Sequence, residues 1–150
     1  MSCSVCECGE CEECGPCVYG TFTQNGSLSI CAGGVIPFDG TADASGISLG
    51  GGEITLSYAG VYLITLHVTV PACDVLQTTF RIRLNGEAVS GGALVIDKEC
   101  AGAPLHTSVQ AVVRACAGDV LSVTTGGCVE LSACTPSDPI AVLTVAKIGC

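Results

Sequence analysis

The sequence predicts an all-β protein, folded as an antiparallel two-sheet jelly-roll sandwich. Three observations support this fold class. Hydrophobic residues make up 49% of the 150 residues and charged residues only 13%, so the chain can form a core. Its apolar stretches alternate with polar residues in the two-residue period of a strand, and Gly or Asn separates them. No stretch shows the 3.6-residue period of a helix.

The clearest strand covers residues 60–70, an eleven-residue run that ends before Pro71. Val, Ile, Thr and Tyr dominate it, and their side chains suit a pleated sheet. One side of this strand is expected in the core: Tyr62, Ile64, Leu66, Val68 and Val70. The other side carries Val61, Leu63, Thr65, His67 and Thr69. That second side is too apolar for an ordinary solvated surface, so we expect another subunit or the opposite sheet to cover it.

The remaining elements follow in order along the chain. Before residue 60, strands are predicted at residues 19–23, 27–31 and 53–57, with a turn at Asn25-Gly26 and a polar loop at 39–46. After residue 71, strands are predicted at 78–84, 87–89, 92–96, 106–114 and 120–124. Turns are predicted at Asn85-Gly86 and at 117–119, and a loop with cysteines at 126–139.

The last predicted strand, residues 140–148, is apolar on both sides, which indicates that both sides are buried. With few aromatic residues in the chain, a trimer that covers one sheet face would account for it. Together with the strand at 60–70, this pattern gives the candidate residues of a trimer interface: Val61, Leu63, Thr65, His67, Leu143 and Val145.

Residues 1–17 form a separate segment, a cysteine-rich connector arm in front of the domain at 18–150. The arm carries Cys3, Cys6, Cys8, Cys11, Cys14 and Cys17, interleaved with Glu, and has no periodic apolar residues. Three interpretations stay open: disulfide bonds to neighbouring subunits, binding of zinc or an iron–sulfur cluster, and a disordered reduced tail. The candidate metal ligands are Cys3, Cys6, Cys8 and Cys11. We favour the disulfide bonds and expect no cofactor.

Thirteen cysteines are an odd number, so internal disulfide bonds would leave at least one thiol over. Cys150, the last residue, joins the arm cysteines as a candidate for intermolecular bonds. The candidates for disulfide bonds inside the domain are Cys31, Cys73, Cys100, Cys128 and Cys134. Of these, Cys128 and Cys134 are a candidate pair. For Cys116 a buried free thiol is an equal alternative, because it follows an apolar strand.

Charge and motifs exclude several classes of function. The net charge of −9 argues against nucleic acid, and the apolar runs are too short for a membrane-spanning helix. The first residues lack the features of a Sec signal, so we expect synthesis without Sec export and later oxidation of the cysteines. His67 has no recognisable catalytic partners, so no enzyme is expected. Asp39 and Asp43 lack the bidentate Glu of a calcium loop, which favours a solvated turn.

Five stretches carry a resemblance to a known family: residues 54–56, 60–64, 80–86, 117–123 and 141–149. In order and spacing they resemble the C1q/TNF-like jelly-roll domain, particularly the versions at the ends of bacterial collagen-like spore-surface glycoproteins. The resemblance covers about residues 19–149 and implies tight trimers that form through the sheets. The chain departs from these proteins in having no Gly-X-Y repeat, and the cysteine arm stands in its place.

These observations predict a structural subunit of a disulfide-cross-linked bacterial surface fibre or layer, such as a spore appendage, exosporium or coat. Its expected partners are copies of itself, first as a homotrimer and then as a head-to-tail polymer, together with other spore-surface proteins. Two alternatives stay open. One is a metal-binding or redox-buffering module on a trimeric jelly roll, and the other is a soluble C1q-like domain that binds a ligand.

Overall fold

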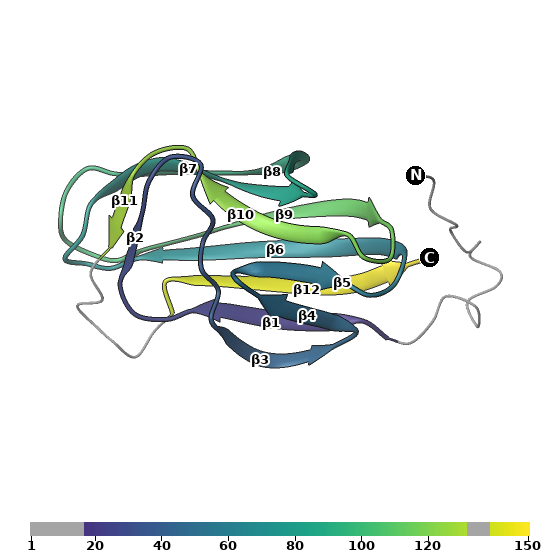
Figure 1. Cartoon of the computed structure of the whole chain (residues 1–150). Coiled ribbons are helices and arrows are strands. Elements are labelled where there is room, and N and C mark those ends of the chain that lie inside the picture. Colours follow the sequence, from purple (N-terminus) through teal and green to yellow (C-terminus); the bar gives the residue numbers. More distant parts are fainter. Residues whose placement is uncertain (1–16, 132–138) are drawn as a thin grey trace.

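The computed structural model describes residues 17–131 and 139–150, in which the chain forms twelve strands (Figure 1). Two five-stranded antiparallel sheets face each other as a sandwich, and a two-stranded ribbon lies at one end. The predicted fold class is confirmed. The predictions for the arm cysteines Cys3, Cys6, Cys8, Cys11 and Cys14 and for Cys134 lie outside the described residues. The predicted arm boundary stays a prediction.

The first sheet, called the β6 sheet below, has the order β3-β1-β12-β6-β9. Its strands are β3 (Gly40–Ser45), β1 (Tyr19–Gln24), β12 (Ala141–Gly149), β6 (Gly60–Val70) and β9 (Leu105–Ala115). The second sheet, called the β7 sheet, has the order β4-β5-β10-β7-β8. Its strands are β4 (Ile47–Gly50), β5 (Glu53–Leu56), β10 (Val120–Thr125), β7 (Leu76–Leu84) and β8 (Glu87–Lys98). The ribbon pairs β2 (Leu28–Ile30) with β11 (Val129–Leu131).

The core lies between the two sheets and is centred on β6. All five β6 side chains predicted to face inward are fully buried: Tyr62, Ile64, Leu66, Val68 and Val70. They belong to one apolar cluster with the inward side chains of β7 and β10, among them Phe80, Ile82, Leu121 and Val123. Full burial of each such side chain stabilises the fold by about 1.5–3 kcal/mol. The Tyr62 hydroxyl donates a hydrogen bond of 2.6 Å to the Tyr58 carbonyl, and burial raises the pKa of this phenol.

The turn predicted at Asn85-Gly86 is confirmed and joins β7 to β8. Asn85 has φ 52° and Gly86 has φ 83°, the left-handed backbone that a two-residue hairpin of type I′ requires. The Asn25-Gly26 signal has a different outcome. It marks a bend between β1 and β2, which lie in different sheets and do not pair with each other.

Three strands differ from the sequence prediction because they are short or polar. The predicted loop at 39–46 contains β3, which pairs with β1 at an edge of the β6 sheet. An edge strand needs one partner only and can expose polar side chains, so its sequence looks like a loop. Strands β4 and β11 were not predicted either. Conversely, the predicted strands at 87–89 and 92–96 form the single strand β8, whose register against β7 shifts at an irregularity between Arg81 and Arg83.

A disulfide bond joins Cys31 to Cys128 across the β2–β11 ribbon. Ile30 and Val129 are register partners in that ribbon, which brings the adjacent cysteines together. Both cysteines are therefore confirmed as members of a domain disulfide. The predicted pairing of Cys128 with Cys134 is wrong. That prediction relied on closeness in the sequence, whereas the pairing of β2 with β11 determines which cysteine lies next to Cys128.

The other described cysteines differ in state. Cys73, Cys116 and Cys150 are disulfide-bonded, whereas Cys17 and Cys100 are exposed and free. The prediction that Cys100 forms a domain disulfide is wrong, and so is the free-thiol alternative for Cys116. Cys150 is disulfide-bonded, and its assignment to an intermolecular bond stays a prediction.

We expect the Cys31–Cys128 bond to be a major source of stability, because it closes a loop with a sequence separation of 97. Replacing both residues by Ser should lower the free energy of unfolding by about 3–5 kcal/mol, since the unfolded chain gains freedom. Denaturant unfolding measures the change. Cys100→Ser, at an exposed free thiol, is the matched control and should change stability little. Equal stability of the double variant and the control would contradict the expectation.

Candidate self-association face

The β6 sheet has one side in the core and another that points away from the sandwich, here called the outer face. Along β6 every second residue, beginning with Val61, lies on this face and is only partly buried. Val61, Leu63, Thr65 and His67 thus lie where the sequence placed them, on the side opposite the core. The opposite sheet does not cover them, since it packs on the other side of β6.

The pairing of β6 with its neighbours defines an apolar row across the outer face. Leu63 is the register partner of Ala146 on β12 and of Val112 on β9. Ala146 is in turn the partner of Tyr19 on β1. Val112 is 58% exposed and Tyr19 is 42% exposed, so the row is open to a partner along its length.

A second row next to it carries uncharged polar side chains. Thr65 is the partner of Thr144 on β12 and of Gln110 on β9. The Gln110 side-chain amide donates to the Thr65 hydroxyl at 3.3 Å. These groups are uncharged and partly paired with one another, so covering them costs far less than covering ions.

Both histidines of the chain lie on the outer face, near the end of β6 that carries Val70. The rings of His67 and His106 are stacked, with centroids 5.9 Å apart and planes at 19°. The Thr69 hydroxyl lies between them, 3.0 Å from His106 Nδ1 and 3.4 Å from His67 Nε2. Sequence reasoning placed His106 on a strand only. The register of β9 against β6 brings it to His67, and this register is not visible in the sequence.

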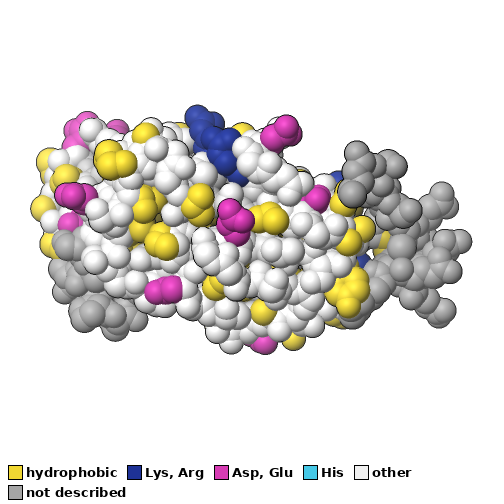
Figure 2. Space-filling view, in the orientation of Figure 1, with side chains coloured by type: hydrophobic (Ala, Val, Ile, Leu, Met, Phe, Trp, Pro, Cys, Tyr) yellow, Lys and Arg dark blue, Asp and Glu magenta, His cyan; other side chains and the backbone are white. Residues whose placement is uncertain are grey.

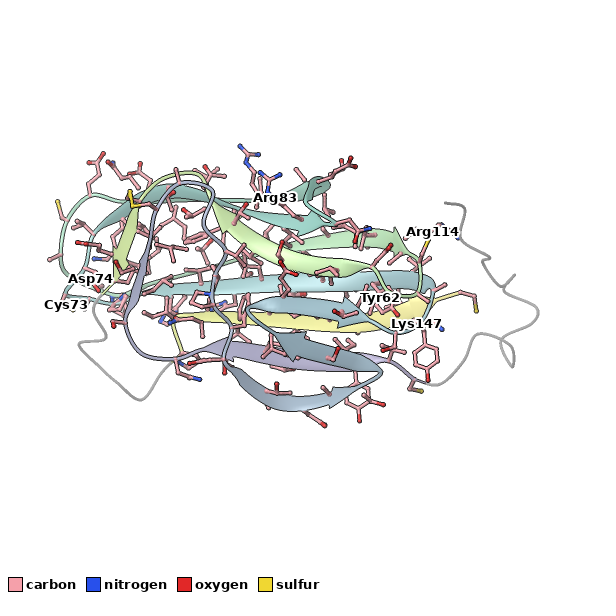
Figure 3. The ribbon with its side chains drawn as sticks, in the orientation of Figure 1. Tyr62, Cys73, Asp74, Arg83, Arg114 and Lys147 are labelled. Atoms are coloured by element: carbon pink, nitrogen blue, oxygen red, sulfur yellow. A yellow bond between two sulfur atoms is a disulfide. The ribbon has the colours of Figure 1, made fainter. Side chains whose placement is uncertain are left out.

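Among residues 17–131 and 139–150, charged side chains of the outer face lie only at its two edges. Asp43 on β3 is the register partner of Thr21, and Arg114 on β9 is the partner of Val61. The outward side chains of β6 and β12 between them carry no Lys, Arg, Asp or Glu: Val61, Leu63, Thr65, His67, Thr69, Val142, Thr144 and Ala146. Figure 3 labels Arg114 near one end of the sandwich.

The prediction that Leu143 and Val145 belong to an interface is wrong. Both have no exposed surface in a single subunit, because they point into the core between the sheets. Strand β12 is apolar on both sides, so its sequence does not say which side faces inward. The register with β6 decides it and turns Val142, Thr144 and Ala146 outward instead.

The opposite side of the molecule has a different surface. In Figure 2 its apolar side chains lie as separate spots among polar ones, with acidic groups between them. A Lys/Arg group lies where Figure 3 labels Arg83. The Arg83 guanidinium donates to the Thr124 hydroxyl at 2.8 Å and to the Gly86 carbonyl at 3.2 Å. That arrangement fixes Arg83 on its own domain.

A groove of about 840 Å³ lies between the ribbon and the ends of β7 and β8. Lys98 lines this groove, and its ammonium group donates hydrogen bonds to the Asp74 and Cys100 carbonyls at 2.5 and 2.9 Å. The Lys98 ammonium group is therefore held by acceptors of its own domain.

Across residues 17–131 and 139–150, no three His, Cys, Asp or Glu side chains come together as metal ligands. Nor does this part of the chain contain a helix long and apolar enough to cross a membrane.

Two facing sheets with these strand orders define the class of the domain, a C1q/TNF-like jelly roll. Among solved structures, the chain is similar to the globular domain of zebrafish complement 1qA, with a TM-score of 0.62, 14% identity, and coverage of 89% of this chain and 98% of that one. It is also similar to Eiger TNF from S. frugiperda, with a TM-score of 0.61, 15% identity, and coverage of 90% and 94%. Murine APRIL gives a TM-score of 0.59, 14% identity, and coverage of 89% and 100%. No family profile and no curated protein sequence matches the chain.

Truncation of an inward side chain of β12 and of an outward side chain of β9 should affect stability differently. Leu143→Ala removes a fully buried side chain and should lower the free energy of unfolding by about 2–5 kcal/mol. Val112→Ala, on the outer face at 58% exposure, should change the stability of the single subunit by only about 0.5 kcal/mol. Denaturant unfolding at low protein concentration compares them. Similar losses in both variants would contradict the assigned orientation of β12.

Proposed function

We propose that the protein is a self-assembling structural subunit whose copies associate through the outer face and are then joined by disulfide bonds. The assembled form is a trimer that polymerises head to tail into a bacterial surface fibre or layer, such as a spore appendage, exosporium or coat. The single observation that carries the proposal is the uncharged, partly apolar outer face over β6 and β12 in a chain of net charge −9.

Charge favours a second copy of the chain as the partner on this face. Identical chains of net charge −9 repel one another wherever their acidic surfaces meet. In the part of the chain that the structure describes, the centre of the outer face carries no Lys, Arg, Asp or Glu, so copies can approach there with the least repulsion. Burial of Leu63, Val112 and Tyr19 then adds hydrophobic stabilisation.

The size of the face suits a stable contact. Its strands β3, β1, β12, β6 and β9 have six, six, nine, eleven and eleven residues. At about 3.3 Å per residue and about 4.8 Å between strands, they cover roughly 680 Å². That area is of the order of the ~800 Å² that each partner contributes to a standard interface.

The two charged edges suit a closed ring. In a cyclic assembly one edge of each subunit meets a different edge of the next. Asp43 and Arg114 lie at opposite edges and have opposite charges, so edge-to-edge contacts in a ring would attract. Three copies agree with the resemblance to C1q/TNF-like domains.

Two exposed thiols lie at opposite ends of the sandwich and support head-to-tail linkage. Cys17 precedes Val18, whose carbonyl accepts a hydrogen bond of 2.9 Å from the Lys147 amide, at the end that carries Tyr62. Cys100 lies in the loop after β8, which is tied to the Cys73 end by a bond from the Gly102 amide to the Ala72 carbonyl. A disulfide between such thiols forms as both lose a proton and an electron to dioxygen, or by exchange with an existing disulfide.

A charge in the apolar row should break the assembly. Val112→Glu places a carboxylate in the proposed contact and should shift the protein from trimer to monomer, because burying an unpaired charge is costly. Sedimentation velocity measures the change. Val95→Glu is the matched control, since Val95 is 71% exposed on β8 of the other sheet, and it should stay trimeric. A monomeric wild-type protein, or a trimeric Val112→Glu variant, would contradict the proposed face.

Covalent linkage should be visible on gels of oxidised protein. Without reductant we expect a ladder or material that does not enter the gel, and with reductant a single band near 15.0 kDa. Cys17→Ser and Cys100→Ser should each shorten the ladder, because each removes one of the two exposed thiols. A monomer in both lanes would contradict the cross-linking proposal and favour a soluble ligand-binding domain.

Elemental analysis tests the metal-binding alternative for the arm. Stoichiometric zinc or iron, lost together with structure on chelation, would favour that alternative.

A further inference from the structure

The stacked histidine pair on the outer face has no role in the contacts described so far. His67 comes from the central strand of the sheet and His106 from its edge strand, and they are the two histidines of the chain. We propose that His67 and His106 form a binding site for a divalent transition metal ion of the zinc type. The site in a single chain is independent of self-association, whereas its completion by neighbouring copies rests on the proposed function.

The geometry directs one nitrogen of each ring to a common point. His67 Nε2 and His106 Nδ1 lie 3.4 and 3.0 Å from the same atom, Thr69 Oγ1. A zinc ion binds imidazole nitrogen at about 2.0–2.1 Å, so two nitrogens that share one ion lie within about 4 Å of each other. His106 is exposed and His67 is only partly buried, so small side-chain rotations can bring both nitrogens onto one ion.

The group that contacts both nitrogens is the uncharged Thr69 hydroxyl, which a metal ion can displace. The register neighbours of His67 are Val142 on β12 and Ser108 on β9, neither of which is ionised. Among the described strands β12, β6 and β9, the rows of His67 and Thr69 hold no Asp, Glu, Lys or Arg. Neutral imidazole is a preferred ligand of zinc, copper and nickel. The net charge of −9 attracts cations to the protein as a whole.

Two imidazoles alone make an incomplete site. Structural zinc sites have four ligands, and the described residues bring no three metal-ligating side chains together. Water completes the coordination in a single chain, which gives weak binding. When copies associate through the outer face, imidazoles of neighbouring subunits can replace those waters. Metal binding then strengthens with assembly, and the metal in turn stabilises the assembled form.

The test uses the full chain with its free thiols alkylated, because thiolates such as Cys17 and Cys100 are also metal ligands. Zinc chloride is titrated by calorimetry, and Cu²⁺ is added separately for electron paramagnetic resonance, in which imidazole nitrogen gives a recognisable hyperfine pattern. Wild type should bind and show nitrogen ligation. His67→Gln and His106→Gln should each weaken zinc binding at least about tenfold, since losing a ligand costs no less than losing an outer-shell partner.

Gln110→Ala, on the same face of β9, is the matched control and should bind zinc as wild type does. Absence of binding by alkylated wild type, or equal binding by both histidine variants and wild type, would overturn the site. Sedimentation with zinc and with a chelator separates the two proposals. Zinc binding that requires both histidines in a protein that stays monomeric supports the site and contradicts the proposed assembly. A trimer without histidine-dependent zinc binding supports the proposed assembly and overturns the metal site.

Discussion

The fold and the proposed contact surface both depend on strand β6, which buries one side in the core and turns the other side outward. This strand lies between β12 and β9, so its backbone hydrogen bonds are satisfied on both edges and its two sides can meet different surroundings. One side supplies five fully buried residues to the core. Because side chains alternate strictly, fixing that side also fixes the outer face, and through the register it fixes which residues of β12 and β9 accompany it. The core and the proposed contact surface are therefore set by one pairing scheme.

That scheme also explains how an acidic chain can retain a neutral region. The acidic residues of the described domain lie in loops, at strand ends and on edge strands, and the Lys/Arg group seen in Figure 2 lies on the other side of the molecule. The middle of the outer face therefore carries threonine, histidine and aliphatic side chains. A region of this kind combines modest hydrophobicity with a low cost of desolvation, which suits a surface that is solvated in the free subunit and buried in an assembly.

Local patterns were enough to predict β6, the hairpin at Asn85-Gly86 and the all-β class, because period and turn chemistry are encoded within a few residues. Features that depend on pairing between distant segments were not predictable. Cys31 meets Cys128 only through the ribbon, so sequence distance suggested the wrong partner. Leu143 and Val145 were placed outward because both sides of β12 are apolar. His106 was missed as a neighbour of His67 for the same reason, since only the register of β9 brings them together.

The antiparallel pairing of β1 with β12 has a mechanical consequence. Val18 and Lys147 are hydrogen-bonded neighbours, so the start of the domain and the end of its last strand lie at one end of the sandwich. A force applied between these two ends would peel the strands apart one hydrogen bond at a time, which offers little resistance. A force transmitted from the Cys17 end to the Cys100 end instead runs along the strands. Within each ladder between β1, β12, β6 and β9 the hydrogen bonds would then share the load, as shear, and the domain would resist stretching along that axis.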